Sequence, residues 1–162
     1  MTFSALRLSA AALLALASLS ANAAPAETRP LTVNGAFLEQ VGPAPRCASQ
    51  FGGTIVGHGD SAVTGRNVFI ASDCITPSGP LFNFTEGKFV IVATNGDQIF
   101  ANYSGQFVPT GVATNYVFSG ATFQITGGNG RFHKASGGGT LSGGSDMATG
   151  QGTLQLNGNI TY

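Results

Sequence analysis

The sequence of 162 residues is poor in charge, since only 9% of its residues are Asp, Glu, Lys or Arg, and it contains no tryptophan. Its seven Lys and Arg residues are scattered and are balanced by seven acidic residues. Proteins that bind nucleic acid use clustered Lys and Arg to displace counterions from the phosphates. The lack of any such cluster argues against nucleic acid as a partner.

Motifs of metal-dependent and nucleotide-dependent enzymes are also missing. The chain has no nucleophile elbow, no phosphate-cradling loop and no metal-binding helix motif, and the glycines at 128 and 130 open no helix after their strand. The two histidines complete no recognisable set of four zinc ligands. We therefore expect no cofactor and no metal, and a protein that is not an enzyme is favoured.

The N-terminus has the features of a secretory signal peptide. Arg7 is the only charged side chain before an apolar run over 8–19, which is shorter than the roughly 20 residues that a membrane span needs. Ala21-Asn22-Ala23 then matches the small-x-small pattern that signal peptidase accepts. An uncleaved anchor or an N-terminal core helix is the alternative. The predicted organisation is a signal peptide over 1–23, a disordered lead-in over 24–30 and one domain over 31–162.

Export places the two cysteines, Cys47 and Cys74, in an oxidising compartment, either the periplasm or the extracellular medium of a bacterium. The pattern therefore predicts a disulfide between them. Such a bridge closes a loop of about 27 residues, which corresponds to roughly 3 kcal/mol of stability in the loop-entropy treatment. A two-ligand metal site and a free thiol are the alternatives.

The region 31–162 contains short runs of β-branched and aromatic residues separated by Gly, Asn, Pro and Ser, and no segment with helical spacing of apolar residues. The dipeptide Asn95-Gly96 predicts a type I′ hairpin turn, because both residues tolerate a positive φ. In the last run Leu154, Leu156 and Ile160 share one face, which we expect to point into a core. The predicted strands are 31–40, 51–57, 65–72, 86–94, 97–107, 116–126, 138–143 and 150–161.

The 24 glycines, many of them within or beside these strands, favour a barrel over a sandwich. Tightly curved strands need glycines at bends and bulges. Closure of the sheet also removes exposed edges, which few charges protect in this chain. The predicted fold class is therefore all-β, a small closed antiparallel barrel of about eight strands.

The segment 127–137 reads Gly-Gly-Asn-Gly-Arg-Phe-His-Lys-Ala-Ser-Gly. It resembles the Gly-Gly-x-Gly-Arg-Phe-x-x-Ala-x-Gly signature of the allene oxide cyclase/dirigent barrel superfamily, a calycin-like fold, and is most similar to the bacterial exported members. Further short motifs that are similar extend the resemblance from Gly53 to Tyr162. The resemblance implies an eight-stranded antiparallel barrel with a ligand-holding cavity. It also implies cofactor-free cyclisation of an epoxide, or steering of radical coupling, as functions.

A set of polar residues supplies the candidates for a site. His58 and Asp60 are two residues apart, so they share a strand face, and a carboxylate can orient an imidazole for proton transfer. They are the catalytic candidates, although surface hydrogen bonding is the commoner role of such a pair. We expect Arg131 to bond loop carbonyls and Phe132 to plug the barrel end. The full polar set is His58, Asp60, Arg66, Asp73, Glu86, Tyr103, Arg131 and His133, and its ligand-binding candidates are Arg66, Tyr103 and Arg131.

Three functions are compatible with these observations. The first is binding of a small apolar molecule inside the barrel. The second, which the resemblance suggests, is a cofactor-independent cyclase/isomerase or coupling guide. The third is a small outer-membrane barrel, because an alternating strand ends at Tyr162, although the absent Trp, the three Tyr and the short strands count against a membrane location. The low charge and many hydroxyls also suit contacts between copies of the chain.

Overall fold

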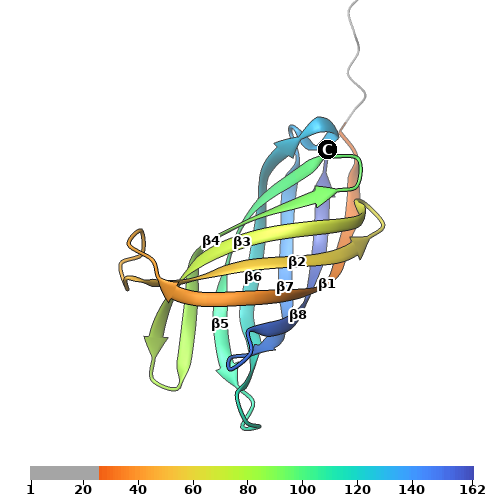
Figure 1. Ribbon diagram of the computed structural model, residues 1–162. Coiled ribbons are helices and arrows are strands. Elements are labelled where there is room, and N and C mark those ends of the chain that lie inside the picture. The colour runs from red at the N-terminus through yellow and green to blue at the C-terminus, as the bar shows by residue number, and fades with distance from the viewer. Residues whose placement is uncertain (1–25) are drawn as a thin grey trace, which may run out of the picture.

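The computed structural model describes residues 26–162, which form a closed antiparallel barrel (Figure 1). Each strand pairs with its neighbours in sequence, and β8 pairs with β1, which closes the sheet. The predicted fold class is confirmed, and the predicted signal peptide over 1–23 lies outside the described residues. The elements are β1 (Thr28–Pro43), β2 (Phe51–Ser61), β3 (Gly65–Ser78), β4 (Leu81–Ala93), β5 (Gln98–Pro109), β6 (Asn115–Asn129), the 3-10 helix η1 (Gly130–Phe132), β7 (Ser136–Asp146) and β8 (Gln151–Thr161).

Two strands, β1 and β4, begin at least three residues earlier than the sequence predicts. Residues 28–30, expected in the lead-in, belong to β1 and pair with the end of β8, where the hydroxyl oxygens of Thr28 and Thr161 lie 2.7 Å apart. Residues 81–85 extend β4 beyond a bulge at which Glu86 has a φ of 52°. The sequence pattern places the start of the strand at 86 because the bulge interrupts the alternation of apolar and polar residues there.

The turn between β4 and β5 is not the predicted type I′ turn. A type I′ turn needs a positive φ at both central residues, and here Gly96 has a φ of 88° while Asn95 does not have a positive φ. The side-chain oxygen of Asn95 instead accepts a hydrogen bond of 3.1 Å from the Asp97 backbone N–H. This local bond stabilises a longer loop, which runs from 94 to 97.

Alternate residues of the strands point into the barrel and form its core. On β1 these are Leu31, Val33 and Phe37, and on β8 they are Leu156 and Ile160, all of them buried. The predicted inward face of the last strand is confirmed. Burial of each such side chain stabilises the fold by about 1.5–3 kcal/mol, so the interior rather than the low-charge surface holds the barrel together.

The two ends of the barrel differ. At one end the fully buried Phe132 of η1 packs edge-on against Tyr162, with ring centroids 4.8 Å apart. Arg131 holds η1 in place, because its Nη2 donates to the Val63 carbonyl at 2.6 Å and its Nε lies 3.4 Å from a carboxylate oxygen of Asp97. The predicted plug and structural arginine are thus confirmed at this sealed end. The opposite end, here called the mouth, carries the half-buried residues Phe82, Tyr116, Phe118, Met147 and Leu154.

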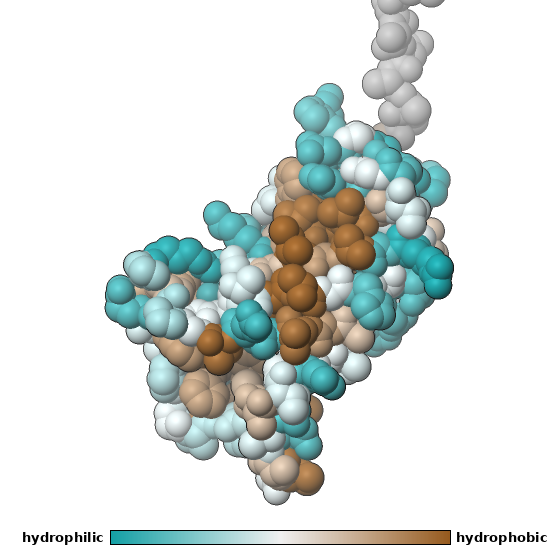
Figure 2. All heavy atoms as spheres, in the orientation of Figure 1, coloured by the Kyte–Doolittle hydropathy of each residue, from teal (hydrophilic) through white to brown (hydrophobic). Residues whose placement is uncertain are grey.

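On the face of the barrel that Figure 2 shows, an apolar patch runs across β2, β3 and β4. It includes Val56, Val68 and Ile70, whose side chains remain more than half exposed. Leu38, Val56 and Ile70 are paired in register from β1 to β3. No helix among residues 26–162 is long and apolar enough to span a membrane.

Candidate functional site

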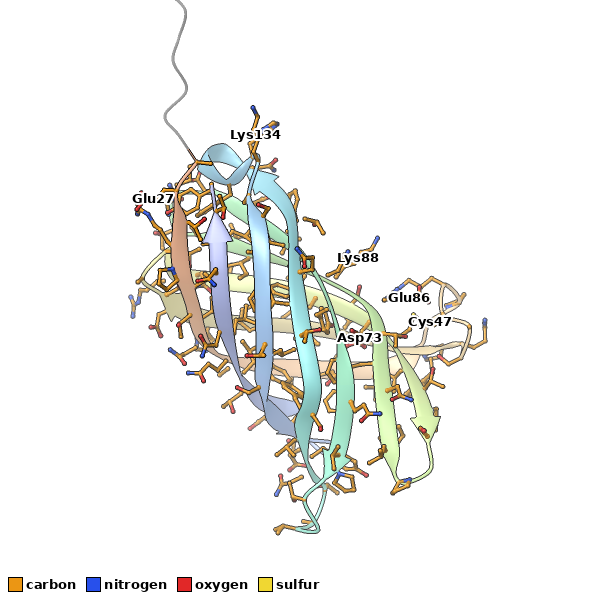
Figure 3. All side chains as sticks on the ribbon, turned by 180° about the vertical axis from the view of Figure 1, so that it is seen from behind. Glu27, Cys47, Asp73, Glu86, Lys88 and Lys134 are labelled. Atoms are coloured by element: carbon orange, nitrogen blue, oxygen red, sulfur yellow. A yellow bond between two sulfur atoms is a disulfide. The ribbon has the colours of Figure 1, made fainter. Side chains whose placement is uncertain are left out.

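The predicted disulfide joins Cys47, in the loop before β2, to Cys74 on β3. The two sulfur atoms lie 2.06 Å apart and the Cα atoms 5.4 Å apart. Figure 3 shows the loop of Cys47 projecting from the side of the barrel, away from the sealed end that carries Glu27 and Lys134. Because Cys74 directly follows Asp73, the disulfide fixes the backbone beside this carboxyl group.

Three ionisable side chains are buried inside the barrel. Glu39 on β1 is 6% exposed, Asp73 on β3 is 1% exposed and Tyr103 on β5 is 8% exposed. All three line one internal cavity. Acidic side chains are rarely buried to this extent unless they are paired or serve a function. We therefore take these residues, named the Glu39 cluster below, as the candidate site.

The cavity beside the Glu39 cluster is small and otherwise apolar. Its volume is about 40 Å³, which has room for roughly three water molecules. Aromatic rings form much of its wall; those of Phe84 and Phe107 have centroids 4.8 Å apart, and that of Phe89 lies 5.7 Å from Tyr103. Side chains thus fill most of the barrel, and the wall of the remaining space is apolar, although the three ionisable residues are among those that line it.

Hydrogen bonding within the cluster is uneven. The Tyr103 hydroxyl donates to Oδ2 of Asp73 at 2.8 Å, and the backbone N–H of Gly53 donates to Oδ1 at 3.2 Å. Oε1 of Glu39, in contrast, has no hydrogen-bond partner in the described structure, and the same is true of the buried Ser145 hydroxyl. Glu39 and Ser145 both border a recess under the β7–β8 turn. The free acceptor of the site is therefore the Glu39 carboxyl group.

Two glycines allow side chains from three alternate strands to meet. A Cβ atom built at Gly53 on β2 would collide with Oε1 of Glu39 and would lie 2.9 Å from Oδ1 of Asp73. The two carboxyl groups therefore face each other over this glycine. On β4, a Cβ atom at Gly87 would lie 2.6 Å from the Tyr103 ring. Tyr103 can therefore lie across β4 and reach Asp73, because β4 has no side chain at this point.

Burial shifts the pKa values of all three groups upward. Desolvation, with a smaller contribution from the negative charge of Asp73, raises the pKa of Glu39 to about 7. Burial also raises the pKa of Asp73, against the opposing effects of its bonds to Tyr103 and Gly53 and of the charge of Arg46. The pKa of Tyr103 is raised by burial and then by Asp73, which keeps the phenol protonated. Glu39 is thus the group that changes charge near neutral pH.

The other candidates from the sequence lie elsewhere. His58 and Asp60 share the outer face of β2, where both are exposed, and Arg66 is exposed at the start of β3. His58 borders a broad, open groove of about 1260 Å³ on the outside of the barrel. Arg131 lies at the sealed end. Of the polar set named from the sequence, the structure brings Tyr103 and Asp73 together, and it leaves Glu86 and His133 exposed at separate points of the surface.

Glu39 was missed by the sequence reasoning, although a signal for it exists. The inward residues of β1 alternate as Leu31, Val33 and Phe37, and continuing this period of two places Glu39 inside. An acidic residue in register with an apolar stripe is therefore the feature that identifies the site from the sequence.

Among residues 26–162, no group of three or more His, Cys, Asp and Glu side chains is placed to hold a metal ion. No protein-family model and no curated protein sequence matches the chain. The fold and the site together define a disulfide-bonded, eight-stranded antiparallel barrel with a buried Glu-Asp-Tyr cluster beside an apolar cavity.

Proposed function

We propose that this protein is an exported barrel that binds a small, mainly apolar molecule in its interior, with a polar group of that molecule at Glu39. The observation that carries the proposal is the unpartnered Oε1 of Glu39, buried behind the wall of a cavity that is lined mainly by aromatic and aliphatic side chains. Ligand sites combine apolar walls with a few placed polar groups in this way. A ligand atom that donates a hydrogen bond would satisfy the free acceptor.

The size of the cavity limits the ligand. Pockets for drug-sized molecules have volumes of about 300–1,000 Å³, whereas this cavity has about 40 Å³. A polar group and a few carbon atoms therefore fit beside Glu39. The remaining atoms of a longer ligand would extend toward the mouth, where Phe118 and Leu154 line the cavity but are only half-buried.

The disulfide supports a location outside the reducing cytoplasm. The distribution of side chains favours an aqueous environment over the outer-membrane alternative. On β8 the outward residues Gln151, Thr153 and Gln155 are exposed and polar, while Leu156 and Ile160 point inward. Transmembrane barrels have the reverse arrangement, with an apolar exterior and a polar interior.

A cofactor-independent cyclase or coupling guide of the allene oxide cyclase/dirigent type is the second candidate. It is favoured by the same Glu39 cluster, because a carboxyl group whose pKa is near 7 suits general acid–base chemistry. Such a function requires a substrate to fit within the barrel, and the cavity of about 40 Å³ is small for the substrates of those families. Binding of a small molecule is therefore the function that we propose first.

Titration with butan-1-ol, followed by NMR chemical shifts, tests interior binding. Ala71→Leu and Leu156→Phe each add bulk to the cavity wall, whereas Val56→Phe adds similar bulk on the outer face. We expect both filling variants to weaken binding at least tenfold and Val56→Phe to leave it unchanged. Thermal melts identify which variants are folded, since overpacking costs about 1–3 kcal/mol. Absence of binding to the wild type, or equal binding by a folded filling variant, would overturn the proposal.

A further inference from the structure

Neither of the two interior carboxyl groups forms an ion pair with a side chain of residues 26–162. In the part of the chain from 26 to 162, the side-chain ion pairs are Arg29 with Glu27 and Arg131 with Asp97, both at the sealed end. The exposed Arg46 influences Asp73 through its charge but forms no ion pair with it. A buried carboxylate without a cation is costly. The interior therefore has a deficit of positive charge on the side where the cavity lies.

The accessible wall of this cavity is apolar, and the polar groups that lie just behind it offer hydrogen-bond acceptors rather than donors. Oε1 of Glu39 is unused, and each oxygen of Asp73 accepts a single bond, from Tyr103 or from Gly53. A carboxylate oxygen can accept two bonds, and an ammonium group supplies three donors without any acceptor. The Tyr103 hydroxyl already donates to Asp73. Once Glu39 is ionised, a ligand that itself needs donors, such as a carboxylate, therefore finds none free among these groups.

The rest of the wall also suits a cation. Phe84, Phe89 and Phe107 line the cavity together with Tyr103, whose ring lies 5.9 Å from Phe84 and 5.7 Å from Phe89. Aromatic faces attract an organic cation, and the attraction strengthens when water is excluded. The aromatic wall thus adds to the attraction of the carboxyl groups and accommodates the carbon atoms next to the charge.

We infer that the ligand of the interior is a small organic amine, whose protonated nitrogen lies between Glu39 and Asp73 and whose carbon chain lies against the aromatic wall. This inference rests on the proposed binding inside the barrel and names the chemical class of its ligand. It requires charge selection: an ammonium ion binds more tightly than a neutral alcohol of the same length, and a carboxylate binds least.

The charge state of the cluster makes this selection depend on pH. The charge of Asp73 acts on Glu39, and Asp73 is in turn influenced by Tyr103 from β5 and by Arg46 from the loop before β2. The other neighbours of Glu39 have no titratable side chain; they are Gly53 on β2 and, near the β7–β8 turn, Ser145 and Gly150. An ammonium ion favours ionised Glu39, so its affinity rises from pH 5 to pH 8, by up to about 100-fold for a pKa near 7. The amine itself stays protonated until about pH 10.

The test compares butylammonium, butan-1-ol and butyrate as ligands at pH 5 and pH 8 and at one ionic strength. Dissociation constants are measured by NMR for the wild type, Glu39→Gln and Glu86→Gln. Glu86 is exposed on β4, so its variant removes the same charge without entering the cavity. We expect butylammonium to bind the wild type at least tenfold more tightly than butan-1-ol at pH 8. The ratio of the dissociation constant of butan-1-ol to that of butylammonium should fall toward one at pH 5 and in Glu39→Gln. It should stay high in Glu86→Gln.

The outcomes separate this inference from the proposed function. If butan-1-ol binds in the interior and butylammonium binds no better at pH 8, interior binding stands and the amine is excluded. Binding by neither compound would overturn both. Should Glu39→Gln not fold, the wild type alone decides, because an affinity for butylammonium that stays flat between pH 5 and pH 8 contradicts a site at Glu39.

Discussion

The hydroxyl of Tyr103 on β5 donates a hydrogen bond of 2.8 Å to Oδ2 of Asp73 on β3. The strand between them, β4, passes under this bond at Gly87, which pairs with Tyr103 and has no side chain to obstruct it. The bond therefore links two strands that are not neighbours in the sheet, and it holds the Asp73 carboxyl group toward the cavity.

Replacement of Tyr103 by phenylalanine removes this bond and leaves Asp73 with the Gly53 N–H as its partner. Hydrogen bonds to charged groups contribute about 1.5–3 kcal/mol, so we expect a loss of roughly 2 kcal/mol in urea unfolding at neutral pH. The pKa of Asp73 should rise further, because the tyrosine bond lowers it. Carboxyl NMR titration measures this rise. An unchanged Asp73 titration would show that the bond does not form in solution.

Stability should fall as the pH rises from 5 to 8. The folded protein holds the Glu39 proton up to a pKa of about 7, compared with 4.5 for the ordinary group. Between these pH values the native state therefore binds more protons than the unfolded state, and it loses on the order of 2 kcal/mol as Glu39 ionises. Asp73, whose pKa is also raised, acts in the same direction.

Chemical unfolding at pH 5 and pH 8 measures this loss, and Glu39→Gln should remove most of it while Glu86→Gln retains it. Equal stability of the wild type at both pH values would mean that Glu39 is hydrated rather than buried.

The close packing of the two carboxyl groups over Gly53 can be tested with a single methyl group. Gly53→Ala places a Cβ atom against Oε1 of Glu39 and Oδ1 of Asp73, so it should separate the carboxyl groups and destabilise the fold by about 1–3 kcal/mol. Gly42→Ala, at the end of β1, meets nothing within 4 Å and serves as the control. Thermal unfolding measures the loss of stability in both variants. A loss in Gly42→Ala as large as that in Gly53→Ala would count against the close approach of the two carboxyl groups.

The disulfide should contribute about 3 kcal/mol, as expected for a loop of 27 residues. The double variant Cys47→Ala/Cys74→Ala should show this loss in urea unfolding without any further effect of a reducing agent. Because Cys74 adjoins Asp73, we also expect the variant to bind butan-1-ol more weakly. Sensitivity of the double variant to reducing agent would point to a different cause.

The architecture could be predicted because its causes are local. Glycine-rich, β-branched runs indicated eight curved strands, and the alternation along the last strand placed Leu156 and Ile160 in the core. The loop sequence also predicted that Phe132 plugs the barrel end and that Arg131 bonds loop carbonyls. Strand limits were less accurate, because the bulge at Glu86 and the pairing of 28–30 with β8 depend on partner strands rather than on the local sequence.

The site could be predicted only in part, because it depends on register and closure. The two-residue spacing of His58 and Asp60 correctly placed both on one face, but that face is the outer one. Gly57 points inward, and a Cβ atom there would collide with the Phe69 ring. A glycine therefore occupies the core side of β2 at this point, and the flanking polar side chains lie on the outer side. Asp73 lies at a shift in register between β3 and β4, and its meeting with Glu39 follows from packing over Gly53.

Intermolecular NOEs between butan-1-ol and assigned methyl groups test interior binding most directly. Leu141 and Leu156 line the cavity, while Val56 and Ile70 belong to the outer apolar patch. A ligand in the barrel should give NOEs to the two leucines and none to the outer pair. NOEs confined to Val56 and Ile70, or no NOEs at saturating ligand, would contradict a binding site beside Glu39.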